Sequence, residues 1–566
     1  MSLAAACKFR DRHRPFAARN GRNGGPLFRR CSGRHLLGFA CSNGTLAGKM
    51  TRATRGLAGG SSYGMSVRAT IRLLGLLCLV LPAALAAAAE PRAPASHDTA
   101  AVPSAAPAPH SAVTHHLLRL PGRTLRFTAT AGAIALRNGA GAAEADIACI
   151  AYTLDGAQAK TRPVTFVFNG GPGEASAWLQ LGAVGPWRIR MAEPGDQRDG
   201  VPSSPPDLLP NAETWLDFTD LVFIDPAGTG YSRILSHDPA VSRRLWSVTG
   251  DIDSLAETIR RWLERAGRVE SPKFLLGESY GGFRVPRLAH ALAEDQGIGV
   301  SGLIMVSPVL DFGTSYALDP LYWVEHLPSL VAVARAKHGP VTRADLADVE
   351  AYATGDFLRD QLAGPRDAAA RSRMAARVAA LTGLAPSLVF REDGGINIRS
   401  FLETIEPGRT ASIYDATITD PDAVPTNPYF REPDPILARL NAPFTSAMLV
   451  LYAKRLHWRP AARYLLSNPD VEEHWNWGHG LVPPQSVTAL RLDLALDPTL
   501  HVLIGQGLFD LITPYFRTVL ILRHLPEIGP PGRIRLVTFE GGHMFYSRNA
   551  SRATFRADAE KLIAGD

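Results

Sequence analysis

Several short segments of the chain are hydrophobic at nearly every position, which is typical of strands buried on both faces of a parallel sheet. These segments are Val164–Phe168, Leu221–Ile224, Phe274–Leu276, Leu303–Val306 and Val502–Ile504. Hydrophobic positions with helical spacing lie between some of them, in 251–266 after Ser247 and Thr249, and in 284–295 after a Gly-Gly turn. The alternation of strand and helix predicts an α/β fold with a mostly parallel, doubly wound sheet.

The chain before these segments has a different pattern. Between Thr114 and Leu154, apolar and polar residues alternate, and Asn138-Gly139 and Asp155-Gly156 provide turns. An alternating pattern broken by glycine-containing turns predicts antiparallel strands.

The strand–helix alternation stops over residues 311–497. This stretch includes helical patterns in 343–362 and 368–381. We interpret it as a largely helical cap insertion over a sheet that is built from residues 113–310 and 498–566.

The N-terminal part of the chain is expected to lie outside the folded body. Residues 1–64 are rich in Arg and Gly and lack hydrophobic periodicity, so they are either a disordered extension or the product of a start codon assigned too early. Residues 65–89 have a basic start, an apolar core and small residues at the end, which is the layout of a secretory signal peptide; a permanent anchor is the alternative. Residues 90–112 are rich in Pro, Ala and Ser and are predicted to form a linker.

The charge distribution argues against a nucleic-acid partner. The whole chain has a formal net charge of +7, but residues 1–64 hold 12 Lys and Arg against one Asp, which is a net charge of +11. Once Arg68 and Arg72 are also counted, residues 73–566 carry a charge of −6. Cys149 is the one cysteine of the expected folded body, so that body is predicted to have neither an intrachain disulfide nor a Cys-x-x-Cys metal site.

Ser279 is the strongest candidate for a nucleophile. The sequence Gly277-Glu-Ser-Tyr-Gly281 follows the predicted strand Phe274–Leu276 and precedes a predicted helix. In that context G-x-S-x-G is a nucleophile elbow, a tight turn that lifts the serine hydroxyl above the sheet; a plain serine in a turn is the alternative. A serine hydroxyl is a poor nucleophile at neutral pH, so it needs a base and an acid that orients the base.

Asp510 and His543 are the candidates for that acid and base. After a nucleophile elbow the expected chain order is Ser, acid, His. Asp510 follows the strand Val502–Ile504, and His543 lies 33 residues later, after the apolar segment 534–539. Asp510 could instead cap a helix and His543 could be an ordinary loop histidine. Their order and their positions after strands together predict a catalytic triad with Ser279.

The sequence Asn169-Gly-Gly-Pro-Gly173 is a candidate oxyanion loop. It follows the strand Val164–Phe168, and its glycines allow the backbone to approach a substrate closely. A tetrahedral intermediate needs N–H donors for its oxyanion, and the N–H of Tyr280, the residue after the nucleophile, is expected to be one of them. A phosphate-binding turn is the alternative, but no Lys-Ser/Thr follows the glycines.

Four motifs in this order resemble the serine carboxypeptidases, a family with the α/β-hydrolase fold. They are Asn169-Gly-Gly-Pro-Gly173, Asp225-Pro-Ala-Gly-Thr-Gly-Tyr-Ser232, Gly277-Glu-Ser-Tyr-Gly281 and Gly542-His-Met544. The resemblance extends from about residue 119 to residue 562 and is patchy through the insertion. It implies a serine-type carboxypeptidase that hydrolyses C-terminal residues from peptides through an acyl-enzyme on Ser279.

The resemblance also implies roles for individual residues. Those that match family positions are Ser279, Asp510 and His543 for the triad, the amides of Gly171 and Tyr280 for the oxyanion hole, and Asn169, Gly170 and Glu278 for binding the substrate's C-terminal carboxylate. Glu278 beside an incoming carboxylate forms a like-charge pair, which is tolerated only if one member holds a proton. Peptidase activity is therefore expected to fall as the pH rises toward neutral.

Three positions depart from the family pattern. Glu174-Ala175-Ser176 replaces a frequent Cys-Ser-Ser, Ala183 stands where many members have a second Glu, and Val167 replaces a common Trp. We therefore expect a thinner carboxylate-binding network, which leaves open whether the chain is a strict exopeptidase or a broader esterase.

Two alternatives to a carboxypeptidase remain at this point. One is an esterase or acyltransferase with the same triad, and the other is a non-catalytic binding protein with the same fold. No cofactor is expected, and the spacing of His474 and His479 matches no standard pair of metal ligands on a helix. The expected partners are peptides with a free C-terminus, and a homodimer is one option. The expected location is the periplasm or the medium, without stable membrane insertion after signal cleavage.

Overall fold

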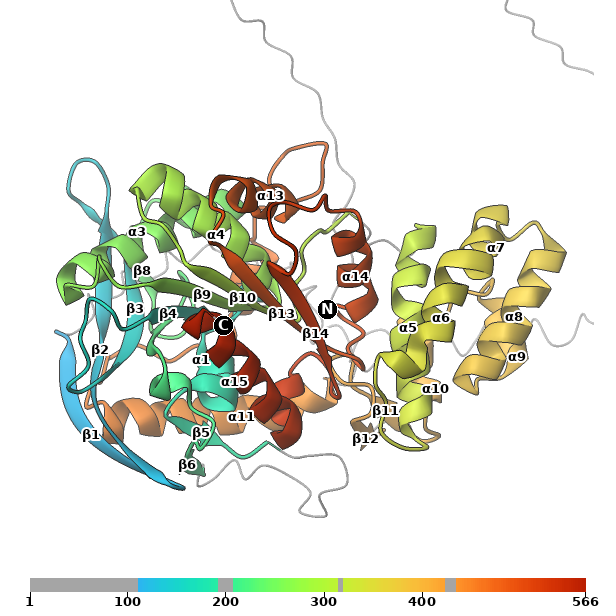
Figure 1. Ribbon diagram of the computed structural model, residues 1–566, viewed down its shortest axis with the longest axis horizontal. Coiled ribbons are helices and arrows are strands. Elements are labelled where there is room, and N and C mark those ends of the chain that lie inside the picture. The colour runs from blue at the N-terminus through green and yellow to red at the C-terminus, as the bar shows by residue number, and fades with distance from the viewer. Residues whose placement is uncertain (1–109, 192–206, 314–318, 423–433, 566) are drawn as a thin grey trace, which may run out of the picture. The chain divides into compact units, whose positions relative to one another are not determined.

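A mixed sheet of ten strands forms the centre of the described structure (Figure 1). The computed structural model describes residues 110–191, 207–313, 319–422 and 434–565, so the expected leader, signal peptide and most of the linker lie outside the described residues. The strand order is β1-β2-β3-β7-β4-β9-β10-β13-β14, with β8 paired to β3. The strands are β1 (Ala112–Leu120), β2 (Arg123–Arg137), β3 (Ala143–Leu154), β4 (Val164–Phe168), β7 (Asp220–Ile224), β8 (Arg233–Ile234), β9 (Lys273–Glu278), β10 (Gly302–Val306), β13 (His501–Gly507) and β14 (Ile534–Phe539).

The half of the sheet from β7 to β14 is parallel throughout. Every residue of β4, β7 and β10 is buried. Along β4, Val164, Phe166 and Phe168 belong to one hydrophobic core, whereas Val167 belongs to a second core. Because successive side chains of a strand point to opposite faces, the two cores cover the two faces of the sheet. The predicted mostly parallel, doubly wound sheet is confirmed.

The N-terminal strands form the antiparallel half. β1 pairs with β2, β2 with β3, and β3 with β7, all antiparallel. Two further strand pairs lie outside this sheet: β5 (Trp187–Ile189) with β6 (Leu208–Pro210), and β11 (Arg409–Ala411) with β12 (Thr419–Pro421). The alternating pattern between Thr114 and Leu154 thus indicates the correct type of structure.

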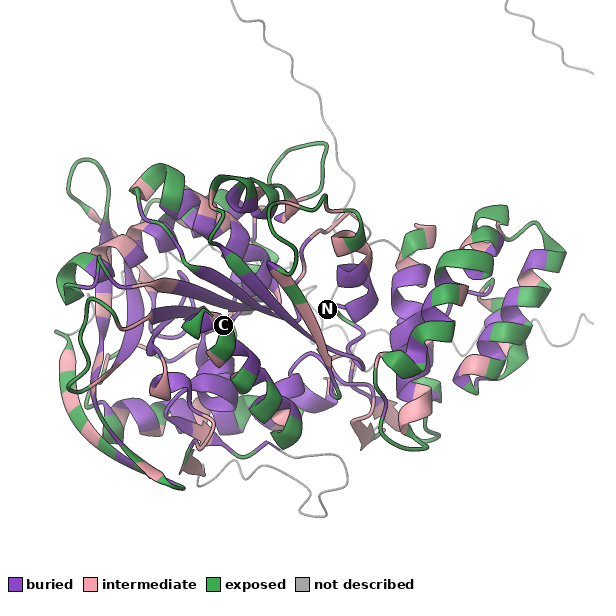
Figure 2. Cartoon of the chain, in the orientation of Figure 1, coloured by how far each residue is buried: buried purple, intermediate pink, exposed green. Residues whose placement is uncertain are grey.

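Helices cover both faces of the sheet. They are α1 (Ala177–Leu179), α2 (Pro239–Leu245), α3 (Val248–Ala266), α4 (Tyr280–Gln296), α5 (Pro320–Ala336), α6 (Ala347–Tyr352), α7 (Leu358–Ala363), α8 (Ala368–Thr382), α9 (Pro386–Arg391), α10 (Ile398–Thr404), α11 (Pro435–Val450), α12 (Pro469–Glu473), α13 (Val487–Leu496), α14 (Tyr515–Arg523) and α15 (Asn549–Ala564). Ser247 caps α3, since its side chain accepts a hydrogen bond from the Gly250 N–H. Figure 2 shows the inner sides of these helices and the sheet as buried, and the outer sides of the helices as exposed.

The single helix expected over 343–362 is interrupted. A π-helical turn at Ala353–Phe357 separates α6 from α7, and Gly355 within it has non-helical backbone angles. Glycine is the residue that tolerates such a conformation most readily, so the helical periodicity continues on both sides while the helix itself breaks.

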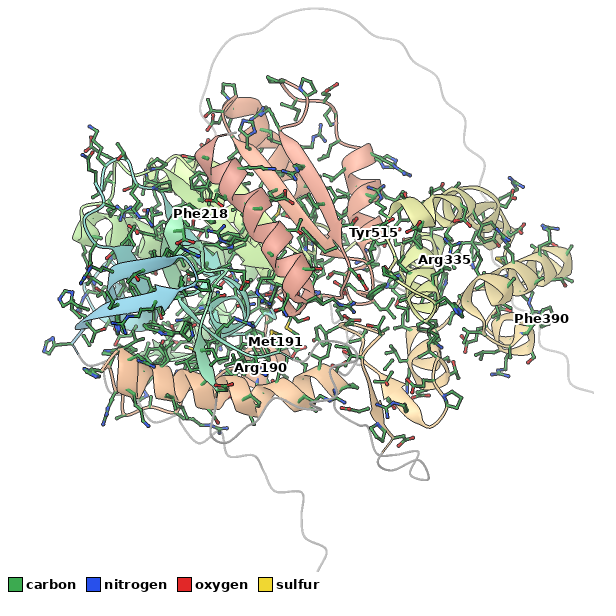
Figure 3. The ribbon with its side chains drawn as sticks, turned by 60° about the horizontal axis from the view of Figure 1, so that its bottom comes forward. Arg190, Met191, Phe218, Arg335, Phe390 and Tyr515 are labelled. Carbon is green, nitrogen blue, oxygen red and sulfur yellow. The ribbon has the colours of Figure 1, made fainter. Side chains whose placement is uncertain are left out.

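Helices α5 to α10 form a helical group beside α14 (Figure 1). Two buried polar contacts join the group to α14. The Tyr515 hydroxyl donates to Glu350 Oε1 at 3.1 Å, and Arg517 Nε donates to Glu325 Oε2 at 2.6 Å. Figure 3 labels Tyr515 at this boundary. The insertion predicted over 311–497 thus contains a helical part attached to the α/β body through α14.

Other parts of the same stretch pack directly on the α/β body. Helix α13 packs against α4, and Phe444 of α11 packs against Trp178 with the two rings tilted and their centroids 4.4 Å apart. The helical segment Pro435–Arg455 is long and apolar enough to cross a membrane, but Phe444, Ala447 and Met448 are buried in the protein core. Its apolar character therefore has an explanation within the folded protein.

A buried cluster of charges fixes the start of β7. Asp220 is 2% exposed and accepts hydrogen bonds from the Leu154 N–H and from Arg162 Nε, at 2.9 and 2.7 Å. Arg268 forms a second ion pair with the same carboxylate. The three side chains hold together the edge of the sheet from which the parallel strands begin.

Replacing Asp220 with Ala is expected to destabilise the protein by about 3–5 kcal/mol, because two largely buried guanidinium groups lose their counter-charge. Urea unfolding monitored by tryptophan fluorescence measures the change. Glu270→Ala is the matched control, because the Lys160–Glu270 pair is 72% and 67% exposed and its loss should cost no more than about 1 kcal/mol. Equal stability of the two variants would show that the Asp220 cluster contributes nothing beyond a surface pair.

Candidate active site

Ser279 lies in a sharp turn between β9 and α4. Its backbone angles are φ 62° and ψ −121°, a conformation that side chains rarely adopt and that costs about 1–3 kcal/mol. The turn brings Gly277 against Gly281, since a Cβ atom on Gly277 would lie 2.1 Å from the Gly281 carbonyl oxygen. The predicted elbow geometry is therefore present, and it explains the glycines on both sides of Ser279.

Backbone hydrogen bonds attach this turn to the end of β10. The Ser279 N–H donates to the Val306 carbonyl at 2.9 Å, and the Val309 N–H donates to the Ser279 carbonyl at 3.3 Å. Parallel strands end at the same edge of a sheet, so the residues after β9, β10, β13 and β14 are neighbours there.

Asp510 and His543 meet at this edge. His543 Nδ1 lies 2.8 Å from Asp510 Oδ2, and both side chains are buried. Asp510 is held by the N–H groups of Ile512 and Thr513 at 2.9 Å and by the Thr513 hydroxyl at 2.5 Å. An ionised carboxylate is only an acceptor, so His543 carries its proton on Nδ1 when neutral and leaves Nε2 free to accept one.

The electrostatic surroundings make His543 a stronger base than an ordinary histidine. Burial by itself lowers the pKa of His543, but the charge and hydrogen bond of Asp510, together with the charge of Glu278, outweigh burial and raise the pKa. The pKa of His543 is therefore set by two opposing effects: desolvation, which lowers it, and the two acidic neighbours, which raise it.

Ser307 connects the two parts of the site. It is fully buried, and its hydroxyl donates to the His543 carbonyl at 2.8 Å. Its own carbonyl accepts from the Thr513 hydroxyl at 3.1 Å. Because Ser307 directly follows the residue that anchors Ser279, hydrogen bonds through Ser307 bring Ser279, Asp510 and His543 to one place. Both bonds join a side-chain hydroxyl to a backbone carbonyl, and within the described residues no hydrogen bond joins the Ser279 hydroxyl directly to His543.

The loop after β4 lies against the elbow. A Cβ atom on Gly170 would be 2.5 Å from the Tyr280 nitrogen, so only glycine fits at position 170. Gly171 has a φ of 102°. Within the described residues, the N–H groups of Gly171 and Tyr280 donate no backbone hydrogen bond. Two unused N–H donors close to the elbow are what an oxyanion hole requires.

Asn169 and Glu278 form a buried hydrogen-bonded pair. Asn169 Nδ2 donates to Glu278 Oε2 at 2.8 Å, and Asn169 Oδ1 accepts from the Leu179 N–H at 2.9 Å. The second contact fixes which end of the amide faces the carboxylate. Burial raises the pKa of Glu278 to about 7, although His543, Tyr546 and Asn169 act in the opposite direction. Glu278 can therefore hold or release a proton near neutral pH.

A buried ion pair, which was not predicted from the sequence, holds the loop after β4 in place. Arg284 is fully buried in α4, and its Nε donates to Asp251 Oδ2 of α3 at 2.7 Å. Arg284 Nη1 donates to the Asn169 carbonyl at 2.6 Å. The sequence contains no local signal for this contact, because it joins residues on two helices and a loop.

Thr513 and Tyr546 were also missed. Thr513 hydrogen-bonds Asp510 and also lies 3.0 Å from His543 Nδ1. The Tyr546 hydroxyl lies 3.1 and 2.9 Å from the two carboxylate oxygens of Glu278. Each lies three residues after a predicted site residue, and that spacing is the signal that could have suggested them.

Aromatic residues of the insertion pack beside the elbow. The ring centroids of Trp475 and Trp477 lie 5.4 and 5.8 Å from that of Tyr280. Within the described part of the chain no group of three or more His, Cys, Asp or Glu side chains could hold a metal ion. His474 Nδ1 instead lies 2.9 Å from the Asp470 carbonyl of its own helix.

Known proteins resemble this chain in sequence and in fold. Residues 152–329 match the family described as serine carboxypeptidase. The pheromone-processing carboxypeptidase KEX1 of Yarrowia lipolytica is 32% identical over 158 residues, which are 27% of this chain and 23% of that protein. Serine carboxypeptidase-like 28 of Arabidopsis thaliana is 28% identical over 226 residues, which are 37% of this chain and 44% of that protein. The matches thus span less than half the length of these curated relatives.

A solved structure extends the likeness in fold to most of the chain. The crystal structure of Kex1(delta)p, a prohormone-processing carboxypeptidase from Saccharomyces cerevisiae, superimposes with a TM-score of 0.50. The match covers 77% of this chain and 91% of that one at 14% identity, so it supports the fold alone. The family match over residues 152–329 and this likeness in fold confirm the resemblance inferred from the motifs: the chain is similar to serine carboxypeptidases in sequence over that stretch, and its fold is similar to that of an α/β-hydrolase.

Proposed function

We propose that this protein is a serine carboxypeptidase that removes C-terminal residues from peptides through an acyl-enzyme on Ser279. The observation that carries the proposal is the buried Asp510–His543 hydrogen bond of 2.8 Å at the sheet edge where the Ser279 elbow lies. The family match over residues 152–329 includes both the elbow and the glycine loop. All three side chains of a triad are present, which favours an enzyme over a non-catalytic binding protein.

The proposed reaction begins with a proton transfer within the triad. His543 Nε2 takes the proton of the Ser279 hydroxyl while Ser279 Oγ attacks the carbonyl carbon of the last peptide bond. The N–H groups of Gly171 and Tyr280 stabilise the oxyanion of the tetrahedral intermediate. His543 then gives its proton to the leaving amine, and the acyl group remains on Ser279 Oγ as an ester. A water molecule, deprotonated by His543, then attacks the ester carbon. The bond from that carbon to Ser279 Oγ breaks, His543 returns the proton to Oγ, and the shortened peptide leaves with a new carboxyl group.

Recognition of the free C-terminus is assigned to Asn169, Gly170 and Glu278. Glu278 with its proton can donate to the substrate carboxylate, whereas ionised Glu278 would repel it. The pair of Asn169 and Glu278 is buried directly beside Ser279, which supports this assignment. An esterase or acyltransferase would use the same triad without needing this pair.

We also propose that the protein is exported, either to the periplasm or to the medium. The signal-like composition of residues 65–89 supports this part of the proposal. The proposed division into an α/β body of 113–310 and 498–566 and an insertion of 311–497 is supported by the helical group α5 to α10 beside α14.

Wild-type protein is expected to shorten a free-acid peptide stepwise from its C-terminus and to leave the matched C-terminal amide nearly uncut at pH 5. Mass spectrometry of timed samples follows the shortening. Ser279→Ala should reduce the rate at least about a thousandfold and should abolish labelling by a fluorophosphonate probe. Thr249→Ala, a hydroxyl loss outside the site, is the control. Equal cleavage of acid and amide would favour an esterase, and absence of labelling in wild type would favour a binding protein.

The preference for the free acid is expected to disappear as the pH rises through about 7, the pKa of Glu278. The substrate carboxylate is ionised throughout this range, so binding is favourable only below the Glu278 pKa, where that side chain is neutral. The ratio of kcat/KM for acid over amide should therefore fall by up to about tenfold per pH unit above it.

The amide substrate serves as the internal control, because loss of the His543 proton at rising pH favours hydrolysis of both substrates. In Glu278→Gln the acid-to-amide ratio should become independent of pH, since glutamine cannot ionise. A ratio that stays constant from pH 5 to pH 8 in wild type would contradict the role assigned to Glu278.

A further inference from the structure

The Glu278 carboxyl group receives contacts from two sides. Asn169 approaches Oε2 from the loop after β4, and the Tyr546 hydroxyl lies within hydrogen-bond distance of both oxygens. Tyr546 belongs to the short 3-10 helix Phe545–Ser547, which begins two residues after His543. A single side chain thus reaches the proposed carboxylate-binding residue from the segment that carries the proposed base.

Tyr546 is held rigidly in this position. It is fully buried, and its backbone carbonyl accepts from Arg552 Nη1 of α15 at 2.9 Å. Its ring lies against Gly182 in the π-helical turn Gln180–Val184, where a Cβ atom would come within 2.8 Å of Tyr546 Cε2. A side chain at position 182 would therefore collide with the ring.

The same turn contains Ala183, which stands where many serine carboxypeptidases have a second Glu. Gly182, the residue before it, leaves the space that the Tyr546 ring fills. Ala183 predicted a thinner carboxylate-binding network, but the Tyr546 hydroxyl, from a distant part of the chain, supplies that network with a hydrogen-bond donor. The network keeps a second polar group beside Glu278, but with a phenol in place of a carboxyl.

This exchange changes the number of charges in the site. Two adjacent buried carboxyls must share a proton, because they cannot both ionise. A phenol is neutral over the working range and donates one hydrogen bond without adding charge. Burial and the charge of Glu278 both raise the pKa of Tyr546 well above that of an ordinary tyrosine, so the hydroxyl stays protonated.

We propose that Tyr546 is a positioning residue for recognition of the substrate's C-terminal carboxylate: its hydroxyl orients the Glu278 carboxyl in place of a second acidic side chain. The proposal rests on the proposed carboxypeptidase function. Tyr546 acts through Glu278 and makes no contact with the reacting atoms.

The groups that face Glu278 allow the direction of the effect to be derived. His543 and Asp510 are the charged groups that act on it from the loops after β14 and β13. Arg284 of α4 faces the Asn169 carbonyl, and the turn Gln180–Val184 contains no ionisable residue. Removing the Tyr546 hydroxyl leaves these groups unchanged and takes away one donor that favours ionised Glu278.

The test is Tyr546→Phe, which keeps the ring against Gly182 and removes only the hydroxyl. Because a donor to the ionised form is lost, the pKa of Glu278 should rise, and the upper limit of the pH profile for the free-acid peptide should move up by about one pH unit. KM for that peptide should increase about three- to tenfold at pH 5, since Glu278 is less well oriented. The kinetics of the matched amide should stay within about twofold of wild type.

Tyr464→Phe is the matched control. Tyr464 is also buried, and within the described residues its hydroxyl has no hydrogen-bond partner. Its loss should leave the acid-to-amide ratio and the pH profile unchanged.

A near-isosteric variant covers the case in which Tyr546→Phe does not fold. Site-specific incorporation of 3-fluorotyrosine in place of Tyr546 keeps the hydroxyl and makes it a stronger donor, so the upper limit should shift to lower pH. Opposite shifts in the two variants would support the proposal. Unshifted limits, or an equal loss toward acid and amide, would overturn it and leave Tyr546 a packing residue. If wild type cleaves neither substrate, the proposed function itself fails, and the two failures are thereby distinguished.

Discussion

Buried carboxyl groups at the carboxyl edge of the parallel strands are the constraint on which the rest of this site depends. Asp510, Glu278 and Asp251 are each at most 3% exposed. A buried charge is tolerated only when donors replace the water that it has lost. The surrounding chain supplies different donors to each: N–H groups, a threonine and a histidine to Asp510, an amide and a phenol to Glu278, and a guanidinium to Asp251. The loops after β4, β13 and β14 are fixed largely by these contacts.

The different donor sets separate two neighbouring carboxyls into two tasks. Asp510 accepts four hydrogen bonds, one of them from His543, and is therefore suited to hold the imidazole in a fixed orientation. Glu278 accepts from two side chains, and burial raises its pKa to about 7. The two carboxyls thus differ in their donors, with four hydrogen bonds at Asp510 and two donor side chains at Glu278, and each donor set suits a different task in the proposed reaction.

The sequence predicted the elements of the α/β body well because each depends on its own residues. The expected strand Val164–Phe168 has the same bounds in the structure, since a continuous apolar run ends where the chain leaves the core. Helix α4 begins at Tyr280, four residues before the expected start, because Gly281 and Gly282 are helical residues that allow close packing against Phe168 and Pro308. In the sequence, the two glycines indicate a turn. They are required instead by contacts between separate elements of the fold, and no local sequence pattern reveals such contacts.

The candidate site was predictable only in part, for the same reason. Ser279, Asp510 and His543 could be selected from motif, order and position after strands, and the structure brings the last two within 2.8 Å. Arg284 and Tyr546 were not selected because their partners come from other elements of the fold. Thr513 bonds Asp510 of its own segment, and its spacing of three residues from Asp510 is the local signal that could have suggested it. Tyr546 is the clearest example. The alanine at position 183 suggests a lost acidic group, yet the space beside Gly182 is filled by a ring from 364 residues further along the chain, whose hydroxyl reaches Glu278. The alanine at position 183 therefore shows that one acidic side chain is missing, but it does not show that Glu278 lacks a second polar contact. A buried polar group such as Glu278 favours any arrangement of the chain that supplies it with a hydrogen-bond donor.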